Sequence, residues 1–360
     1  MLLIELGVRM IGYYLPQSTP YMSYYDADVG VIRMTPNYDG KQHTLEHPFA
    51  VHSNKYGFRD VDRNLTSTKT RIILVGDSFA FGYVDFEDTI SQQLERMYGG
   101  EVEVLNMGYY GYEPREYYRL IENVAVNFNP DIIVNTFFLG NDIRMTNDSM
   151  RNEIPTYYKG YLVGDQNTDS ALFKLKFFLR VHVKSTFLYK NIIASIPGMQ
   201  PVLEKLGISA PLQRDGYLVP EKSIYANNLS TEISKQYDYS LSYFSRIQDI
   251  ATEQDIDYVV VMIPSKFTID PEQYIMQYLP DKDFNAMNLF FASHLDFRKP
   301  HKVSAAYFKE NNIRYVDTLP ELSQREIEET YWVIDGHLTA EGNRIVAQKI
   351  YKYLSEEAIV

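Results

Sequence analysis

The sequence contains no cysteine, and it has no excess of basic residues. The missing thiols exclude a cysteine nucleophile, disulfide bonds, cysteine-ligated zinc and iron–sulfur clusters. Lys and Arg number 35 against 47 Asp and Glu, so the formal net charge at pH 7 is -12. A chain with this charge lacks the basic surface that binds nucleic-acid phosphates. We therefore expect neither thiol chemistry nor a nucleic-acid partner.

The chain also lacks a hydrophobic run long enough to span a bilayer. Its apolar start, MLLIELGVRMIGYYLP (residues 1–16), is shorter than the ~20 apolar residues of a transmembrane helix, and Glu5 and Arg9 interrupt it. It also lacks the basic start and small-residue cleavage site of a secretory signal peptide. Two interpretations stay open. One is the stump or interfacial end of a membrane anchor, which predicts membrane association through residues 1–16, and the other is an amphipathic helix packed on the domain.

Length and composition are typical of a folded globular protein. The chain has 360 residues, of which 45% are hydrophobic and 23% are charged. Residues 1–70 hold the apolar segment and then an arm rich in Pro, Gly, Asn, Asp and Tyr, which we expect to be irregular and to wrap the main domain. Residues 71–360 alternate buried-type strands with helices, and this alternation predicts a parallel sheet covered on both faces. The expected strands lie at 72–76, 102–108, 130–142, 257–264 and 313–320, and the expected helices at 87–98, 113–129, 238–251, 305–312 and 339–357.

Short polar motifs follow these strands at the edge where an open parallel sheet binds ligands. Gly76-Asp77-Ser78 follows the first strand, NMGYYG (106–111) ends the second, Gly140-Asn141-Asp142 ends the third, and DGHLTAEGN (335–343) precedes the last helix. Each motif alone is of a kind that is common in turns. Of the seven histidines, only His337 follows an acidic residue in a loop at this edge. The order of the four motifs and their shared position in the topology predict a single site.

A stretch from about 145 to 236 breaks the alternation. It holds the apolar and basic segment ALFKLKFFLRVHVKSTFLYKNIIASI (171–196), which predicts one or two helices, and then a segment rich in Pro and Gly. We expect a helical insertion over the catalytic face of the sheet, with its apolar positions forming core or lid packing.

The residue types in the four motifs suit acyl transfer to a serine. Ser78 is expected to begin a helix, where free N–H groups and the helix dipole favour negative charge. His337 would take the serine proton and return it to the leaving group, and Asp335 would hold the imidazole in the required tautomer. The Gly111 N–H and the Asn141 side chain would stabilise the oxyanion beside Ser78. Loss of one such donor typically costs about 3–4 kcal/mol in the transition state.

These residues resemble the four sequence blocks of the SGNH (GDSL) hydrolase superfamily. The matching segments are GDSFAFG, NMGYYG, LGND and DGHLTAEGN, and the resemblance covers 71 to about 138 and then 257 to the end. It implies a flavodoxin-like three-layer α/β/α fold with a five-stranded parallel sheet, serine esterase chemistry, and no metal or other cofactor. The arm segment HSNKYGFRD (52–60) also resembles bacterial members with an N-terminal membrane segment. That likeness implies a bacterial protein. A membrane anchor with the domain facing outside the cytoplasm is one open interpretation, and the sequence does not fix the side of the membrane.

The spacing of the last block departs from the family pattern. Only Gly336 separates Asp335 from His337, whereas the family most often has two intervening residues. A Ser–His dyad oriented by a backbone carbonyl therefore stays open beside the triad. The predicted reaction is hydrolysis of a carboxylic ester through an acyl-enzyme. The predicted substrate is an acylated small molecule or carbohydrate, with the O-acetyl groups of a polysaccharide as the more specific expectation.

Three alternatives keep some of the same residues. An acyltransferase would pass the acyl group to a sugar hydroxyl through the same Ser–His chemistry. A non-catalytic carbohydrate-binding or assembly protein would retain the fold, although it has no need of a Ser–His pair. A phosphatase or metal hydrolase would use Asp77, Asp142 and Asp335 as ligands, but the histidines of such a site are not near them in the sequence.

Overall fold

A parallel five-stranded sheet forms the centre of the protein. The computed structural model describes residues 19–44, 46–143, 155–163, 168–183, 223–272 and 293–360. The strands, in spatial order, are β11 (Tyr315–Asp317), β10 (Asp257–Ile263), β7 (Ile132–Phe138), β5 (Thr70–Val75) and β6 (Val102–Asn106). Read in chain order this is the 2-1-3-4-5 arrangement of flavodoxin-like folds. The predicted fold class is confirmed.

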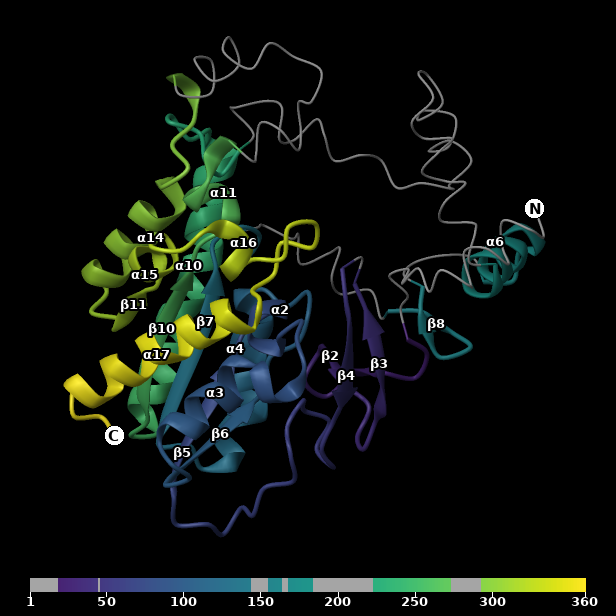
Figure 1. Cartoon of the computed structure of the whole chain (residues 1–360), viewed down its shortest axis with the longest axis horizontal. Coiled ribbons are helices and arrows are strands. Elements are labelled where there is room, and N and C mark those ends of the chain that lie inside the picture. The colour runs from purple at the N-terminus through teal and green to yellow at the C-terminus, as the bar shows by residue number, and fades with distance from the viewer. Residues whose placement is uncertain (1–18, 45, 144–154, 164–167, 184–222, 273–292) are drawn as a thin grey trace.

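Helices cover both faces of this sheet (Figure 1). On one face α4 (Pro114–Asn123), α10 (Thr231–Glu253) and α14 (Lys299–Glu310) share an apolar core with one set of strand side chains. On the other face α3 (Ile90–Met97) and α17 (Ala340–Glu356) pack on the alternate set. The two cores explain why the strands read as continuous apolar runs. Shorter helical segments are α2 (Ser78–Phe81), η1 (Phe86–Asp88), η2 (Ala125–Phe128), α11 (Lys266–Ile269), α15 (Leu319–Leu322) and α16 (Ile327–Thr330).

Three helices differ in extent from the sequence prediction. The helix expected at 238–251 begins at Thr231, where the Ser230 hydroxyl accepts from the Ile233 N–H, so residues 231–236 of the expected insertion belong to α10. The helix expected at 113–129 ends at Asn123, and the chain tightens into η2 before Asn129 reverses it with a φ of +49°. The helix expected at 305–312 begins earlier, at Lys299, because Pro300 fits the first turn of a helix. The predicted N-cap of the last helix is confirmed, since the Thr339 hydroxyl accepts a hydrogen bond from the Gly342 N–H (3.1 Å).

The arm is not irregular throughout, contrary to the expectation from its composition. It forms two antiparallel hairpins, β1–β2 (Ser23–Asp26, Val31–Met34) and β3–β4 (Asp39–His43, Pro48–His52). These strands are only four or five residues long and β3 is mostly polar, so no sustained period marks them. The apolar residues of β2 and β4 still join the core that lies under α4.

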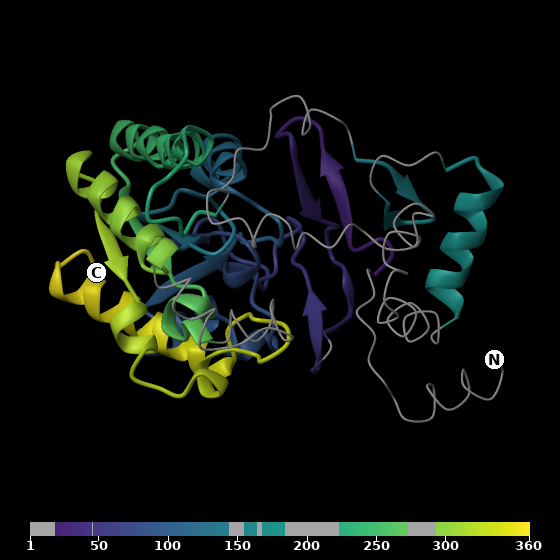
Figure 2. The same ribbon diagram turned by 90° about the horizontal axis from the view of Figure 1, so that it is seen from above.

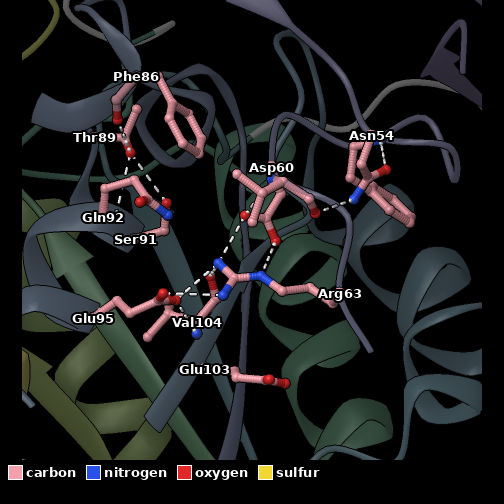
Figure 3. Close-up of polar contacts among 12 residues, drawn as sticks. Asn54, Asp60, Arg63, Phe86, Thr89, Ser91, Gln92, Glu95, Glu103 and Val104 are labelled. Carbon is pink, nitrogen blue, oxygen red and sulfur yellow. Dashed lines mark hydrogen bonds and ion pairs between the residues drawn. The ribbon is translucent and has the colours of Figure 1, made fainter. Parts of the chain in front are cut away.

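Arg63, just after the hairpins, ties the arm to the sheet (Figure 3). Its guanidinium donates to the Asp60 carboxylate (3.1 and 2.9 Å), to Glu95 of α3 (3.0 Å) and to the Val104 carbonyl of β6 (3.2 Å). Glu95 in turn accepts from the Val104 N–H (2.8 Å). The arm is therefore fixed against both a helix and a strand of the main domain.

Residues 155–163 and 168–183 of the insertion lie beyond the hairpins rather than over the edge of the sheet that carries the motifs (Figures 1 and 2). Residues 223–236 instead lead into α10, and the Tyr225 hydroxyl lies 2.9 Å from the hydroxyl of Ser265, which follows β10. A small hairpin, β8–β9 (Tyr157–Tyr158, Tyr161–Leu162), packs on α6 (Ala171–His182) in a separate apolar cluster. This cluster meets the arm where the Tyr21 N–H donates to the Gly160 carbonyl (2.7 Å). The rest of the expected helical segment, from 184 to 196, and the N-terminal segment 1–16 lie outside the described residues. In the part of the chain that is described, no helix has the length and apolar character to cross a membrane.

Candidate active site

Ser78 begins α2 just after strand β5, which lies between β7 and β6 in the sheet. The turn is tight, because a Cβ on Gly76 would overlap the Thr136 side chain. The Asp77 carboxylate caps the helix by accepting from the Phe79 N–H (2.9 Å). Ser78 is buried, with 6% of its surface exposed. Strand, glycine and cap together fix the serine at the carboxyl edge of the sheet.

His337 and Asp335 lie in a closed turn that precedes α17. The Trp332 N–H donates to the His337 carbonyl (2.8 Å), and the Gly336 N–H donates back to the Trp332 carbonyl (2.9 Å). Gly336 has a φ of +83°, a conformation that favours glycine. This left-handed residue turns the chain so that the Asp335 carboxylate reaches the imidazole two positions later. The unusual one-residue spacing is therefore compatible with an Asp–His hydrogen bond.

The three side chains form a hydrogen-bonded chain. Asp335 Oδ1 lies 2.5 Å from His337 Nδ1, and His337 Nε2 lies 2.7 Å from Ser78 Oγ. The carboxylate assigns the Nδ1–H tautomer, which leaves Nε2 as the acceptor of the serine proton. Ser78 Oγ is also 3.3 Å from Asp77 Oδ2, a longer and weaker contact. The arrangement can transfer a proton from Ser78 to His337.

Two aromatic rings contact the imidazole. The Tyr83 ring stacks on His337 with centroids 4.0 Å apart, and the Phe79 ring lies tilted at 4.9 Å. Phe79 in turn stacks on Phe138 at 3.8 Å. The His337 and Asp335 side chains keep 19% and 16% of their surface exposed. The pair is held in orientation but stays within reach of solvent.

The two expected oxyanion donors follow the strands on either side of β5. Gly111 lies after β6 with a φ of +77°, and among the described residues, its two chain neighbours aside, no heavy atom lies within 4 Å of the position that its Cβ would take. Gly108 of the same motif instead packs against Ala80 of α2, where a Cβ would overlap. Asn141 is half-buried in the turn after β7. Donation to an oxyanion by Gly111 and Asn141 stays a prediction.

Two buried carboxyl groups lie close to this site. Burial, followed by the charge of Asp77, raises the pKa of Asp142 well above its ordinary value of 3.8. Burial also raises the pKa of Asp77 to about 6. Asp142 Oδ2 accepts from the Tyr117 hydroxyl (2.7 Å) and the Phe138 N–H (2.9 Å), whereas Oδ1 has no partner among the described residues. Within the described ranges, no three His, Cys, Asp or Glu side chains are grouped so that they could hold a metal ion.

We expect Asp142→Asn to stabilise the protein at neutral pH. A carboxyl whose pKa is raised on folding contributes stability at low pH that is lost as the pH rises through its folded pKa. Asparagine retains an oxygen acceptor and does not titrate, so the gain in Tm should be roughly 2–4 °C at pH 8 and smaller at pH 5. Differential scanning calorimetry at both pH values tests this, with the exposed Asp249→Asn as a control. An equal shift at both pH values would contradict the assignment.

Sequence reasoning missed three residues of the arm that contact the site's supporting elements. Glu46 accepts hydrogen bonds from the turn that carries Asp335, and the His47 ring stacks on Trp332 at 3.9 Å. Arg59 donates to carbonyl groups at the end of α2. Arg59 belongs to HSNKYGFRD, which the resemblance singled out without a role, whereas no sequence pattern marks Glu46 or His47.

Comparison with known proteins gives structural neighbours only. No family model and no curated protein matches the chain. A GDSL-like lipase from Bacteroides thetaiotaomicron is 12% identical, with 80% of this chain and 89% of that chain covered and a TM-score of 0.36. A lipase/acylhydrolase from Enterococcus faecalis is 11% identical over 80% and 96% of the two chains, with a TM-score of 0.39. A carbohydrate acetylesterase family member from Sinorhizobium meliloti is 12% identical over 80% and 98%, with a TM-score of 0.38.

The identities and TM-scores of these neighbours are low, so they carry no argument about the family or the substrate of this chain. What the chain does must be inferred from its own residues.

Proposed function

We propose that the chain is a serine esterase of the SGNH type, with Ser78 as nucleophile, His337 as general base and acid, and Asp335 as the residue that orients His337. The observation that supports this most directly is the chain of hydrogen bonds from Asp335 through His337 to Ser78, at 2.5 and 2.7 Å. A binding protein has no need of an imidazole that accepts from a buried serine at a helix start. The alternative of a non-catalytic protein is therefore less well supported.

The reaction proceeds through an acyl-enzyme. Ser78 Oγ attacks the ester carbonyl carbon while its proton passes to His337 Nε2, and the imidazolium is stabilised by Asp335. The oxyanion is stabilised by backbone N–H groups at Ser78 and Gly111 and by the Asn141 amide. Collapse of this intermediate breaks the ester C–O bond, and His337 returns the proton to the leaving alkoxide. Water then attacks the acyl-enzyme while its proton passes to His337. The bond between the acyl carbon and Ser78 Oγ breaks, His337 returns the proton to Ser78, and the acid is released.

The proposed substrate is an acylated carbohydrate, with O-acetyl groups of a polysaccharide as the first candidates. The motif resemblance and the abundant tyrosine, 31 residues, support this class. Release of acetate from acetylated glycans by the purified protein is the expected result. Cleavage of long-chain esters with no acetate release would overturn the assignment. Addition of a sugar acceptor separates the acyltransferase, because a transferase would acetylate the acceptor at the expense of free acetate.

The nucleophile can be tested without knowledge of the substrate. A fluorophosphonate should form a single adduct on Ser78, located by intact mass and peptide mapping, and Ser78→Ala should abolish it. His337→Ala should slow labelling by about 10²–10⁴-fold, the usual contribution of a general base. Ser91→Ala is the matched control, since Ser91 is also buried and contacts Thr89 rather than a histidine. No adduct on a folded protein would contradict the proposed function.

A further inference from the structure

The turn that carries Asp335 and His337 is held by a carboxylate from the distant arm. Glu46, between β3 and β4, accepts from three consecutive backbone N–H groups. Its Oε1 accepts from Val333 (2.9 Å), and its Oε2 accepts from Ile334 (3.0 Å) and Asp335 (2.8 Å). Successive N–H groups that converge in this way form an anion-binding nest. The carboxylate of Glu46 fills it.

We propose that Glu46 is a positioning residue for the esterase reaction, which acts by fixing the turn that carries Asp335 and His337. This inference rests on the proposed function. One of the three donors is the N–H of Asp335 itself, so the place of the carboxylate that orients His337 depends directly on Glu46. Misplacement of a reacting group by about 1 Å can cost 10²-fold in rate.

Burial does not fix this turn. Val333 and Ile334 are apolar but 51% and 60% exposed, so they add little to the core. Polar contacts must hold their backbone instead, because exposed apolar side chains give no packing that would define a conformation. Besides Glu46, the Lys266 ammonium donates to the Val333 carbonyl (2.7 Å). Charged groups from two other elements therefore help to set the position of this exposed part of the turn, beside the backbone hydrogen bonds of Trp332 that close it.

The residue after Glu46 connects the arm to the other side of the imidazole. His47 stacks on Trp332 with centroids 3.9 Å apart, and its Nε2–H donates to the Tyr83 carbonyl (2.7 Å). The Tyr83 ring stacks on His337. Glu46 therefore binds the turn that carries His337, and His47 binds the backbone of Tyr83, whose ring covers the imidazole.

The test compares Glu46→Gln with wild type in the full chain. A glutamine amide presents an NH₂ group where the nest needs an acceptor, so kcat and the rate of Ser78 labelling should fall by about 10–10²-fold while KM stays within about twofold. Trp332 is the only tryptophan, so its fluorescence emission reports the turn directly. If Glu46→Gln moves the turn away from His47, the two rings no longer stack and the emission should change. Glu87→Gln is the matched control, because the Glu87 side chain is 73% exposed on the surface.

Chemical rescue separates positioning from folding. Formate added to Glu46→Ala should occupy the vacated nest and restore labelling and emission toward wild type, whereas chloride at equal ionic strength should not. A labelling rate in Glu46→Gln equal to that of wild type would overturn the inference. So would a loss of activity that formate does not reverse. Absence of labelling in the wild type would instead contradict the proposed function.

Discussion

Asparagine in place of Asp335 is expected to lower kcat by about 10⁴-fold at neutral pH with little change in stability. The carboxylate accepts from His337 Nδ1–H at 2.5 Å, and this bond leaves Nε2 free to take the Ser78 proton. An asparagine can turn its NH₂ group toward Nδ1, which selects the opposite tautomer. His337 Nε2 would then carry a proton and could not act as the base. Steady-state kinetics on the ester that the wild type cleaves, with fluorophosphonate labelling beside it, measure the effect.

The same experiment decides between a triad and a dyad. If a backbone carbonyl sufficed to orient His337, Asp335→Asn and Asp335→Ala would both stay within about tenfold of wild type. Asp317→Asn is the matched control. Asp317 Oδ1 lies 3.6 Å from His301 Nε2, which makes a second Asp–His pair that has no serine partner in the proposed mechanism. Its replacement should leave kcat unchanged.

The sheet and the order of its motifs could be predicted from the sequence because both depend on local sequence patterns. After its first residue, strand β10 (Asp257–Ile263) reads as an unbroken apolar run, and such a run marks burial on both faces. Parallel strands bring their carboxyl ends to one edge, so the topology alone placed Ser78 near His337, 259 positions later in the chain.

The contribution of the arm could not be predicted in the same way. Strand β3 (Asp39–His43) is mostly polar and short, so neither a periodic pattern nor an apolar run marks it. The partners of Glu46 are backbone N–H groups that lie 287 to 289 positions away. Every residue except proline has such a group, so no residue type at 333–335 signals the contact. When a side chain binds backbone groups far away in the sequence, no particular residue type is needed at the partner positions, so the sequence does not reveal the contact.

Arg59 should be the arm residue whose loss destabilises the protein most. Its side chain is fully buried and donates to the carbonyl groups of Phe81 (2.7 Å), Val84 (2.6 Å), Ala50 (3.1 Å) and Gly82. Burial lowers the pKa of Arg59 to about 9, so the guanidinium remains charged at neutral pH. The position of Arg59 depends on the preceding loop, which requires glycine at 57: Gly57 has a φ of +76°, and a Cβ there would overlap the Met34 carbonyl oxygen.

Arg59→Met is therefore expected to lower the free energy of unfolding by roughly 4 kcal/mol, as judged by urea denaturation at pH 7. Methionine fills similar volume, but it leaves the four carbonyl groups without their donor. Arg59→Lys should recover part of the loss, because one ammonium cannot reach all four acceptors. The control Arg96→Met removes a half-exposed arginine and should change stability by no more than about 0.5 kcal/mol. If Arg59→Met proves as mild as Arg96→Met, water must satisfy these carbonyl groups, and the end of α2 does not depend on the arm.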